Sequence, residues 1–167
     1  MSIEVQTKTF SVEVECDPVS GKVLEERWHD NKGALNRPGD LPAYIRYCPD
    51  TGLPDYRRWH NGQGCHRESD LPASINTHTK TGIDTILSYE ILGQYHRDGD
   101  KPAFIVHRTD GTIQQEDFWK YGKLHRDPQL GPARIFYSED AKEVAEVEYW
   151  VNGTKISAPN IQPTLDM

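Results

Sequence analysis

Residues 66–75 read HRESDLPASI, and thirty residues later the chain reads HRDGDKPAFI. Each stretch places an arginine five positions before a Pro-Ala pair, with acidic residues between them. Pro-Ala recurs at positions 42–43, 72–73, 102–103 and 132–133, and an isoleucine stands two residues beyond each alanine. A fixed period of this length indicates a chain assembled from repeated supersecondary units.

The same period extends along the rest of the chain. An aromatic column is expected at Trp28, Trp59, Tyr89, Trp119 and Trp150, and a glycine follows each within five residues. The period predicts an N-terminal cap over residues 1–21 and units over about 22–52, 53–82, 83–111 and 112–140. A partial unit over 141–157 completes the expected single domain, 1–157, and a flexible tail is expected over 158–167.

Each unit reads as two β-strands joined by a turn. The stretches PAYIRYCPDTG, PASINTHTKTG and PAFIVHRTDG begin with proline, which a strand tolerates at its first residue. They end in Asp, Thr and Gly, which favour turns. The sequence therefore predicts an all-β fold, an open antiparallel meander of β-hairpin repeats of about thirty residues that forms an extended, twisted sheet.

The composition narrows the function classes. A net charge of -7, from 19 Lys and Arg against 26 Asp and Glu, disfavours nucleic acid and favours a protein partner with a basic surface. Three cysteines cannot form a complete disulfide framework, and no secretory signal or membrane-spanning apolar run is visible. The expected location is cytoplasmic, and neither a membrane span nor a cofactor is expected.

The stretches WHNGQGCHRESDLPASI and WKYGKLHRDPQLGPARI resemble a divergent MORN-type repeat, in which an aromatic residue, a glycine, His-Arg and Pro-Ala follow one another. The resemblance covers roughly residues 22–155. Proteins of this kind occur in bacteria and large DNA viruses, and a related bacterial group is labelled as antitoxins. The resemblance implies hairpin repeats in an open sheet, and contact with proteins or lipids rather than chemistry.

The repeated loops allow two interpretations. Arg37, Arg67 and Arg97 each precede an aspartate by three residues, which predicts an Arg–Asp pair within each loop that fixes its turn. Alternatively, the loops bind anionic small molecules or lipid headgroups. The residues of this alternative anion-binding site are His66, Arg67, His96, Arg97, His125 and Arg126.

Metal binding and catalysis are not expected. Equivalent histidines of neighbouring units should lie two strands apart, about 9–10 Å, which is too far to share one zinc ion. Cys65 precedes His66, but adjacent residues of an extended chain point apart, so no Cys-His dyad is implied. Paired acids such as Glu116 and Asp117 are expected to line a solvated strand.

Recognition is expected where the units differ. Positions beside the constant isoleucines, and positions two residues before the aromatic column, vary from unit to unit. The predicted partner-binding residues are Tyr44, Arg57, Leu87, Phe104, Val106, Arg134 and Phe136. They indicate a non-enzymatic protein-binding module of the immunity, antitoxin or inhibitor type, which covers its partner with a sheet face. Unpaired edge strands also allow a homodimer.

Overall fold

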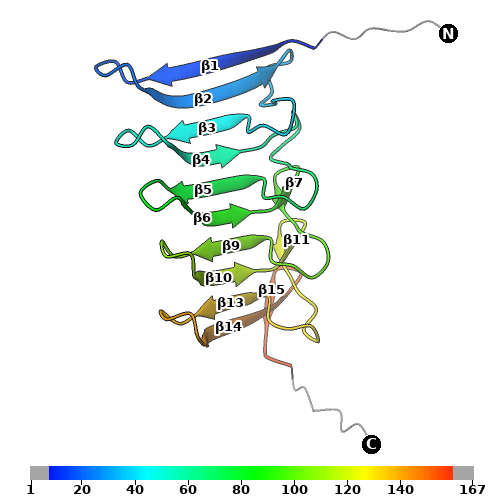
Figure 1. Ribbon diagram of the computed structural model, residues 1–167. Helices are drawn as coiled ribbons and strands as arrows, with labels where there is room; N and C mark the ends of the chain where they lie inside the picture. Colours follow the sequence, from blue (N-terminus) through cyan, green and yellow to red (C-terminus); the bar gives the residue numbers. More distant parts are fainter. Residues whose placement is uncertain (1–7, 160–167) are drawn as a thin grey trace, which may run out of the picture.

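One antiparallel sheet dominates the computed structural model, which describes residues 8–159 (Figure 1). Eleven strands follow one another across this sheet in chain order, and two short strand pairs lie beside it. The first and last strands do not pair with each other, so the sheet is open. The described residues contain strands and turns and no α-helix. The predicted fold class, an all-β open antiparallel meander, is confirmed.

The strands of the large sheet are β1 (Phe10–Cys16), β2 (Val23–Asp30), β3 (Tyr44–Tyr47), β4 (Pro54–Arg58), β5 (Ser74–His78), β6 (Ile83–Ser88), β9 (Phe104–His107), β10 (Ile113–Asp117), β13 (Arg134–Tyr137), β14 (Val144–Val151) and β15 (Thr154–Ile156). The short pairs are β7 (Glu90–Ile91) with β8 (Gln94–Tyr95), and β11 (Trp119–Lys120) with β12 (Lys123–Leu124). Residues 1–7 of the predicted cap and 160–167 of the predicted tail lie outside the described residues.

The Pro-Ala pairs recur because their alanines are core residues. Ala43, Ala73, Ala103 and Ala133 have no exposed surface. The carbonyl oxygen of each accepts the backbone N–H of the aromatic residue that ends the neighbouring strand, as Ala73 does from Trp59 at 2.8 Å. The core therefore runs as a line across the sheet, at the end of the strands where the loops lie.

These hydrogen bonds correct the predicted aromatic column at two positions. In the fourth unit the N–H bonded to Ala133 belongs to Phe118 (2.7 Å), not to Trp119. Phe118 is 6 % exposed. In the last unit Ala133 donates its own N–H to Glu148, which aligns Tyr149 rather than Trp150 with the column. Two aromatic residues stand side by side in both places, and a step of one residue moves a side chain to the other face.

The strand register defines the two faces of the sheet. Residues opposite one another in antiparallel neighbours point to the same side, and successive residues alternate. One row contains Ile45, Arg57, Ile75, Leu87, Ile105, Glu116, Ile135 and Val147, and we call this side the isoleucine face. The opposite side, the variable face, carries Tyr44, Arg58, Ser74, Ser88, Phe104, Asp117 and Arg134 in one row, and Arg46, Tyr56, Asn76, Ile86, Val106, Gln115 and Phe136 in the next.

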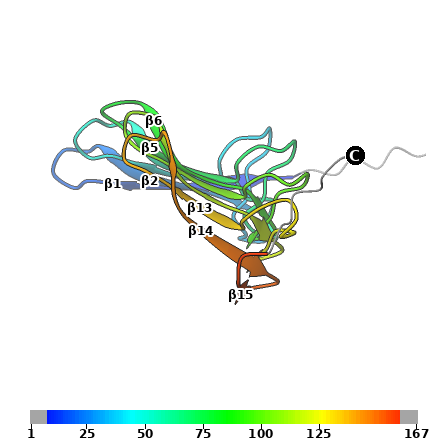
Figure 2. The ribbon, with the colours of Figure 1, turned by 90° about the horizontal axis from the view of Figure 1, so that it is seen from below.

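Connections at one end of the strands pass to both sides of the sheet, as the view along the stack shows (Figure 2). The Pro-Ala loops cover the isoleucine face, where the guanidinium carbon of Arg67 lies 3.9 Å from the ring centroid of Trp59. The short hairpins cover the variable face, where the rings of Tyr95 and Phe104 are 5.8 Å apart. The remainder of the sheet is a single layer throughout the part of the chain that the structure describes (Figures 1 and 2).

The short turns also join neighbouring units. Gly93 has a φ of 81°, a left-handed conformation that glycine adopts without steric cost. Its N–H donates to the carbonyl of Cys65 in the preceding unit at 2.8 Å. Gly122 makes the equivalent bond to Tyr95 at 2.9 Å. Contacts between consecutive units thus reach beyond the sheet hydrogen bonds.

Candidate functional site

The arginines of the Pro-Ala loops pack against the buried aromatic column. The guanidinium carbon of Arg97 lies 3.6 Å from the ring centroid of Tyr89. The same contact joins Arg37, Arg67 and Arg126 to Trp28, Trp59 and Phe118, at 3.8–4.0 Å. Each of the four also donates from Nη1 to the carbonyl of the proline in its own Pro-Ala pair, at 3.2–3.4 Å. These cations therefore serve as packing residues for the loops.

Three of these arginines form ion pairs between units, which corrects the prediction of pairs within one loop. Arg97 donates from Nε and Nη2 to the two carboxylate oxygens of Asp70 in the preceding loop, at 2.6 and 3.3 Å. Arg67 binds Asp40 in the same way, with both contacts at 2.9 Å. The guanidinium lies flat on the ring of its own unit and meets the neighbouring loop there, rather than the turn three residues ahead.

The pairing leaves few guanidinium donors for an external anion. Arg126 donates to both oxygens of Asp100 at 2.8 Å, and the side chains of all three paired arginines are 15 % exposed. Arg97 and Lys101 together lower the pKa of Asp70 to about 2. An anion at the predicted arginine site would therefore have to displace a carboxylate that already occupies both donors.

The three histidines of the predicted anion site also have internal partners. His66 Nε2 lies 2.8 Å from Glu68, and His96 Nε2 lies 3.1 Å from Asp98. His125 accepts the backbone N–H of Asn152 on Nδ1, at 3.1 Å. A groove of about 370 Å³ brings together His66, Arg67, His96 and Arg97. Glu68 and Asp98 line the same groove and are 87 and 91 % exposed, so their charges oppose the entry of an anion.

The predicted partner-binding residues do not share one face. Tyr44, Phe104, Val106, Arg134 and Phe136 lie on the variable face. Arg57 and Leu87 lie on the isoleucine face, because their Cα atoms oppose Ile45 and Ile75. Arg57 is also tied to Thr77 and Asp84 by hydrogen bonds of 3.0 Å. The prediction that all seven form one surface is therefore wrong for these two residues.

A half-buried apolar row crosses the middle of the variable face. Ile86 opposes Val106, Val106 opposes Gln115, and Gln115 opposes Phe136, which places the row over β6, β9, β10 and β13. Sequence reasoning missed Ile86, although its position one residue before Leu87 assigns it to the opposite face by alternation. The loops and short hairpins gather at one end of the strands (Figures 1 and 2).

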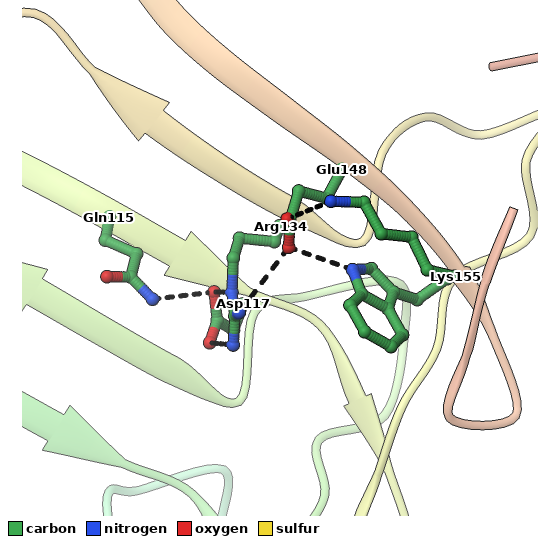
Figure 3. Close-up of polar contacts among 6 residues, drawn as sticks. Gln115, Asp117, Arg134, Glu148 and Lys155 are labelled. Carbon is green, nitrogen blue, oxygen red and sulfur yellow. Dashed lines mark hydrogen bonds and ion pairs between the residues drawn. The ribbon is translucent and has the colours of Figure 1, made fainter. Parts of the chain in front are cut away.

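Charged groups form a connected cluster at the C-terminal end of the variable face (Figure 3). Arg134 binds both oxygens of Asp117 at 2.8 Å, and Gln115 donates to Asp117 at 2.9 Å. Arg134 also reaches Glu148 at 3.5 Å, and Lys155 pairs with Glu148 and lowers its pKa. Asp117 is 2 % exposed, so the expectation that it lines a solvated strand is wrong. Arg134 is committed to these internal pairs.

The pKa values of two cysteine thiols shift in opposite directions. Burial raises the pKa of the Cys65 thiol to about 12. Hydrogen bonds from Thr51 and Thr79 lower the pKa of Cys48 to about 7.

Among residues 8–159, no three His, Cys, Asp or Glu side chains gather closely enough to hold a metal ion. Nor does any helix of these residues have the length and apolarity to cross a membrane.

Comparison of the chain with protein-family models, with curated proteins and with solved structures finds no match.

Proposed function

We propose that this chain is a non-enzymatic protein-binding module that uses the variable face of its sheet. The observation that carries the proposal is the uncovered apolar row of Ile86, Val106 and Phe136. Ile86 and Val106 lie side by side on neighbouring strands, and Phe136 follows in the same row beyond Gln115. A partner that covers them removes apolar area from water. Tyr44 and Tyr56 extend this surface toward the N-terminal units, with ring centroids 5.7 Å apart.

The two sides of the sheet differ in which residues recur from unit to unit, and this difference supports the proposal. The residues that recur in every unit, the loop arginines and the buried aromatic column, bind one another and build the stack. Both rows of the opposite side of the sheet vary between units, whereas the isoleucine face keeps its isoleucine in each unit and varies only at Arg57, Leu87, Glu116 and Val147. A repeat architecture with a constant building face and a variable face is typical of proteins that grip a partner along their length.

The partner that we propose has a basic surface, and the module is of the immunity, antitoxin or inhibitor type within a MORN-like group. The chain carries a net charge of -7, which accelerates encounter with a cationic partner. Charge also favours a different protein over a second copy at the open edge. Strand β1 presents Glu13 and Glu15, and two such strands side by side would repel each other.

The test is a pull-down from a lysate of the organism that encodes the chain, with Val106→Glu as the disrupting variant. Val147→Glu is the matched control, because it introduces the same charge on the isoleucine face at a residue that is 41 % exposed. The proposal predicts one stoichiometric protein with the wild type and with Val147→Glu, and its loss with Val106→Glu. Equal capture by both variants would contradict the use of the variable face.

A further inference from the structure

A small hollow lies on the variable face over strands β2, β3 and β4. Its lining consists of Arg27, Leu35, Tyr44, Tyr56, Arg58 and His60. Its volume is about 260 Å³, just below the range of pockets that enclose drug-sized ligands, so an occupant must be small. Two tyrosine rings, an imidazole and a leucine make most of the wall apolar, while two guanidinium groups supply positive charge. No carboxylate is among the described residues that line it.

Arg58 is the least satisfied cation beside this hollow. Its Nη2 contacts Glu90 at 3.4 Å, while Arg134 on the same face binds a carboxylate through two bonds of 2.8 Å. The Nε atom of Arg58 is buried and has no hydrogen-bond partner among residues 8–159. The Arg58 side chain as a whole is 37 % exposed, so a small anion can approach it from solvent.

His60 lies half-buried beside this cation. Burial, and then the charge of Arg58, lowers the pKa of His60 to about 4. The imidazole is therefore neutral at pH 7 and does not neutralise or repel an incoming anion. Arg27, the other cation that lines the hollow, is paired with Glu25 and Glu15. The guanidinium of Arg58 is thus the group that an anion in the hollow would meet.

The chain contains an internal control for this hollow two units further along. Equivalent backbone hydrogen bonds at the short turns and at the alanines define which positions correspond. Tyr95 corresponds to Leu35, Phe104 to Tyr44, and Trp119 to His60. There, Tyr95 fills the space, with its ring centroid 5.8 Å from that of Phe104 and 5.2 Å from that of Trp119. Near the N-terminus the shorter Leu35 leaves the space open, and Arg58 replaces the Asp117 of the filled site.

We infer that this hollow is a binding site for a carboxylate carried on a small planar apolar group. The carboxylate pairs with Arg58, and the apolar group lies against Tyr44, Tyr56 and Leu35. Two sources supply this chemistry: a free aryl carboxylic acid, and the terminal carboxylate of a peptide that ends in an aromatic residue. The site shares Tyr44 and Tyr56 with the extension of the proposed protein-binding surface, but Ile86, Val106 and Phe136 do not line it.

The experiment is a titration of the full chain with benzoate, followed by NMR of the His60 imidazole and by calorimetry, with neutral benzamide as the matched probe. Saturable benzoate binding that shifts the His60 resonances, at least tenfold tighter than benzamide, is expected. Arg58→Gln should lose tenfold or more in affinity. Arg46→Gln is the control, since Arg46 lies on the same face outside the hollow and pairs with Asp55.

Two further variants sharpen the result. Leu35→Tyr should fill the hollow as Tyr95 fills its counterpart, and should abolish benzoate binding while thermal unfolding stays cooperative. Val106→Glu should leave benzoate binding unchanged, because Val106 belongs to the proposed protein-binding row and does not line the hollow. Tighter binding of a peptide ending in a free phenylalanine carboxylate than of benzoate would assign the site to a peptide terminus, and the reverse order to a free acid.

The inference is overturned if neither benzoate nor the peptide binds saturably. It is equally overturned if Arg58→Gln binds benzoate within twofold of the wild type.

Discussion

Arg97 lies flat on the ring of Tyr89 in its own unit and holds both carboxylate oxygens of Asp70 in the unit before it. One side chain thereby joins two consecutive hairpins, and Arg67 and Arg126 repeat the contact. An elongated single-layer sheet has little core, so contacts between nearest neighbours must supply its stability. The sequence offers these loops as an alternative anion-binding site, but in the structure their arginines connect consecutive units of the sheet.

Removing the charge of Asp70 should weaken its ion pair with Arg97, which connects two units. Asp70→Asn keeps the shape of the side chain, and asparagine tolerates the left-handed backbone (φ 54°) at this position. We expect a loss of about 1 kcal/mol at pH 7, because solvent screens a carboxylate that is 42 % exposed. Urea unfolding measures it, with Glu139→Gln as the exposed control.

The same pair has a defined pH dependence. The folded-state pKa of Asp70 is about 2, below the unfolded value of about 3.9. The contribution of the pair is therefore complete above about pH 4 and is lost as the pH falls toward 2. The stabilities of the wild type and Asp70→Asn should converge over this interval, and a constant difference down to pH 2 would contradict the pairing.

The corrected aromatic column predicts unequal losses of stability at two adjacent residues. Phe118 is 6 % exposed and lies under Arg126, so Phe118→Ala should cost about 3 kcal/mol of unfolding free energy. Trp119→Ala should cost less than half as much, because Trp119 is only half-buried against Tyr95. Denaturant unfolding of the two variants decides the register, and a larger loss from Trp119→Ala would restore the column predicted from the sequence.

The buried pair of Asp117 and Arg134 should respond differently to single and double replacement. Asp117→Leu alone leaves Arg134 without its bidentate partner and should cost about 3 kcal/mol or more. Adding Arg134→Met removes the stranded charge and should recover at least 1 kcal/mol of that loss. Thermal unfolding of the three proteins measures both steps. Additive losses in the double variant would show that the two groups do not interact.

Cysteine labelling gives a prediction that needs no mutation. Cys48, with a pKa of about 7, should react with iodoacetamide at neutral pH, and about fifteenfold more slowly near pH 5.5 as its thiolate is protonated. Cys65, buried and with a pKa of about 12, should stay unmodified in the native protein. Peptide mass spectrometry measures both, and concentrated guanidinium chloride, which exposes Cys65, is the control. Native labelling of Cys65 ahead of Cys48 would contradict the fold.

Local pattern was sufficient to predict the strands of the large sheet, but not the short pairs β7–β8 and β11–β12. Ala73 and Ile75 alternate with polar neighbours after a proline and before a turn, and this period of two admits only an extended chain. The order of the hairpins across the sheet could be predicted from the fixed thirty-residue interval between the Pro-Ala pairs. Both features depend on residues close together in sequence, which is why the predicted meander agrees with the observed one.

Side-chain direction and pairing could not be predicted in the same way. Phe118 and Trp119 are adjacent aromatics, and the spacing alone cannot show which of them enters the core. Asp70 is three residues from Arg67 and 27 residues from Arg97, yet it binds the distant one. The hollow beside Arg58 depends on the sizes of side chains from neighbouring units, so no single stretch of sequence contains it.

The measurement that tests the account most directly is a pair of double-mutant cycles at Asp70. One combines Asp70→Asn with Arg97→Gln, and the other combines Asp70→Asn with Arg67→Gln, with unfolding free energy as the readout. If the Arg97–Asp70 pair connects two units, the first cycle should give a coupling of about 1 kcal/mol and the second cycle none. Coupling to Arg67 and none to Arg97 would contradict the account, because each loop would then close on itself.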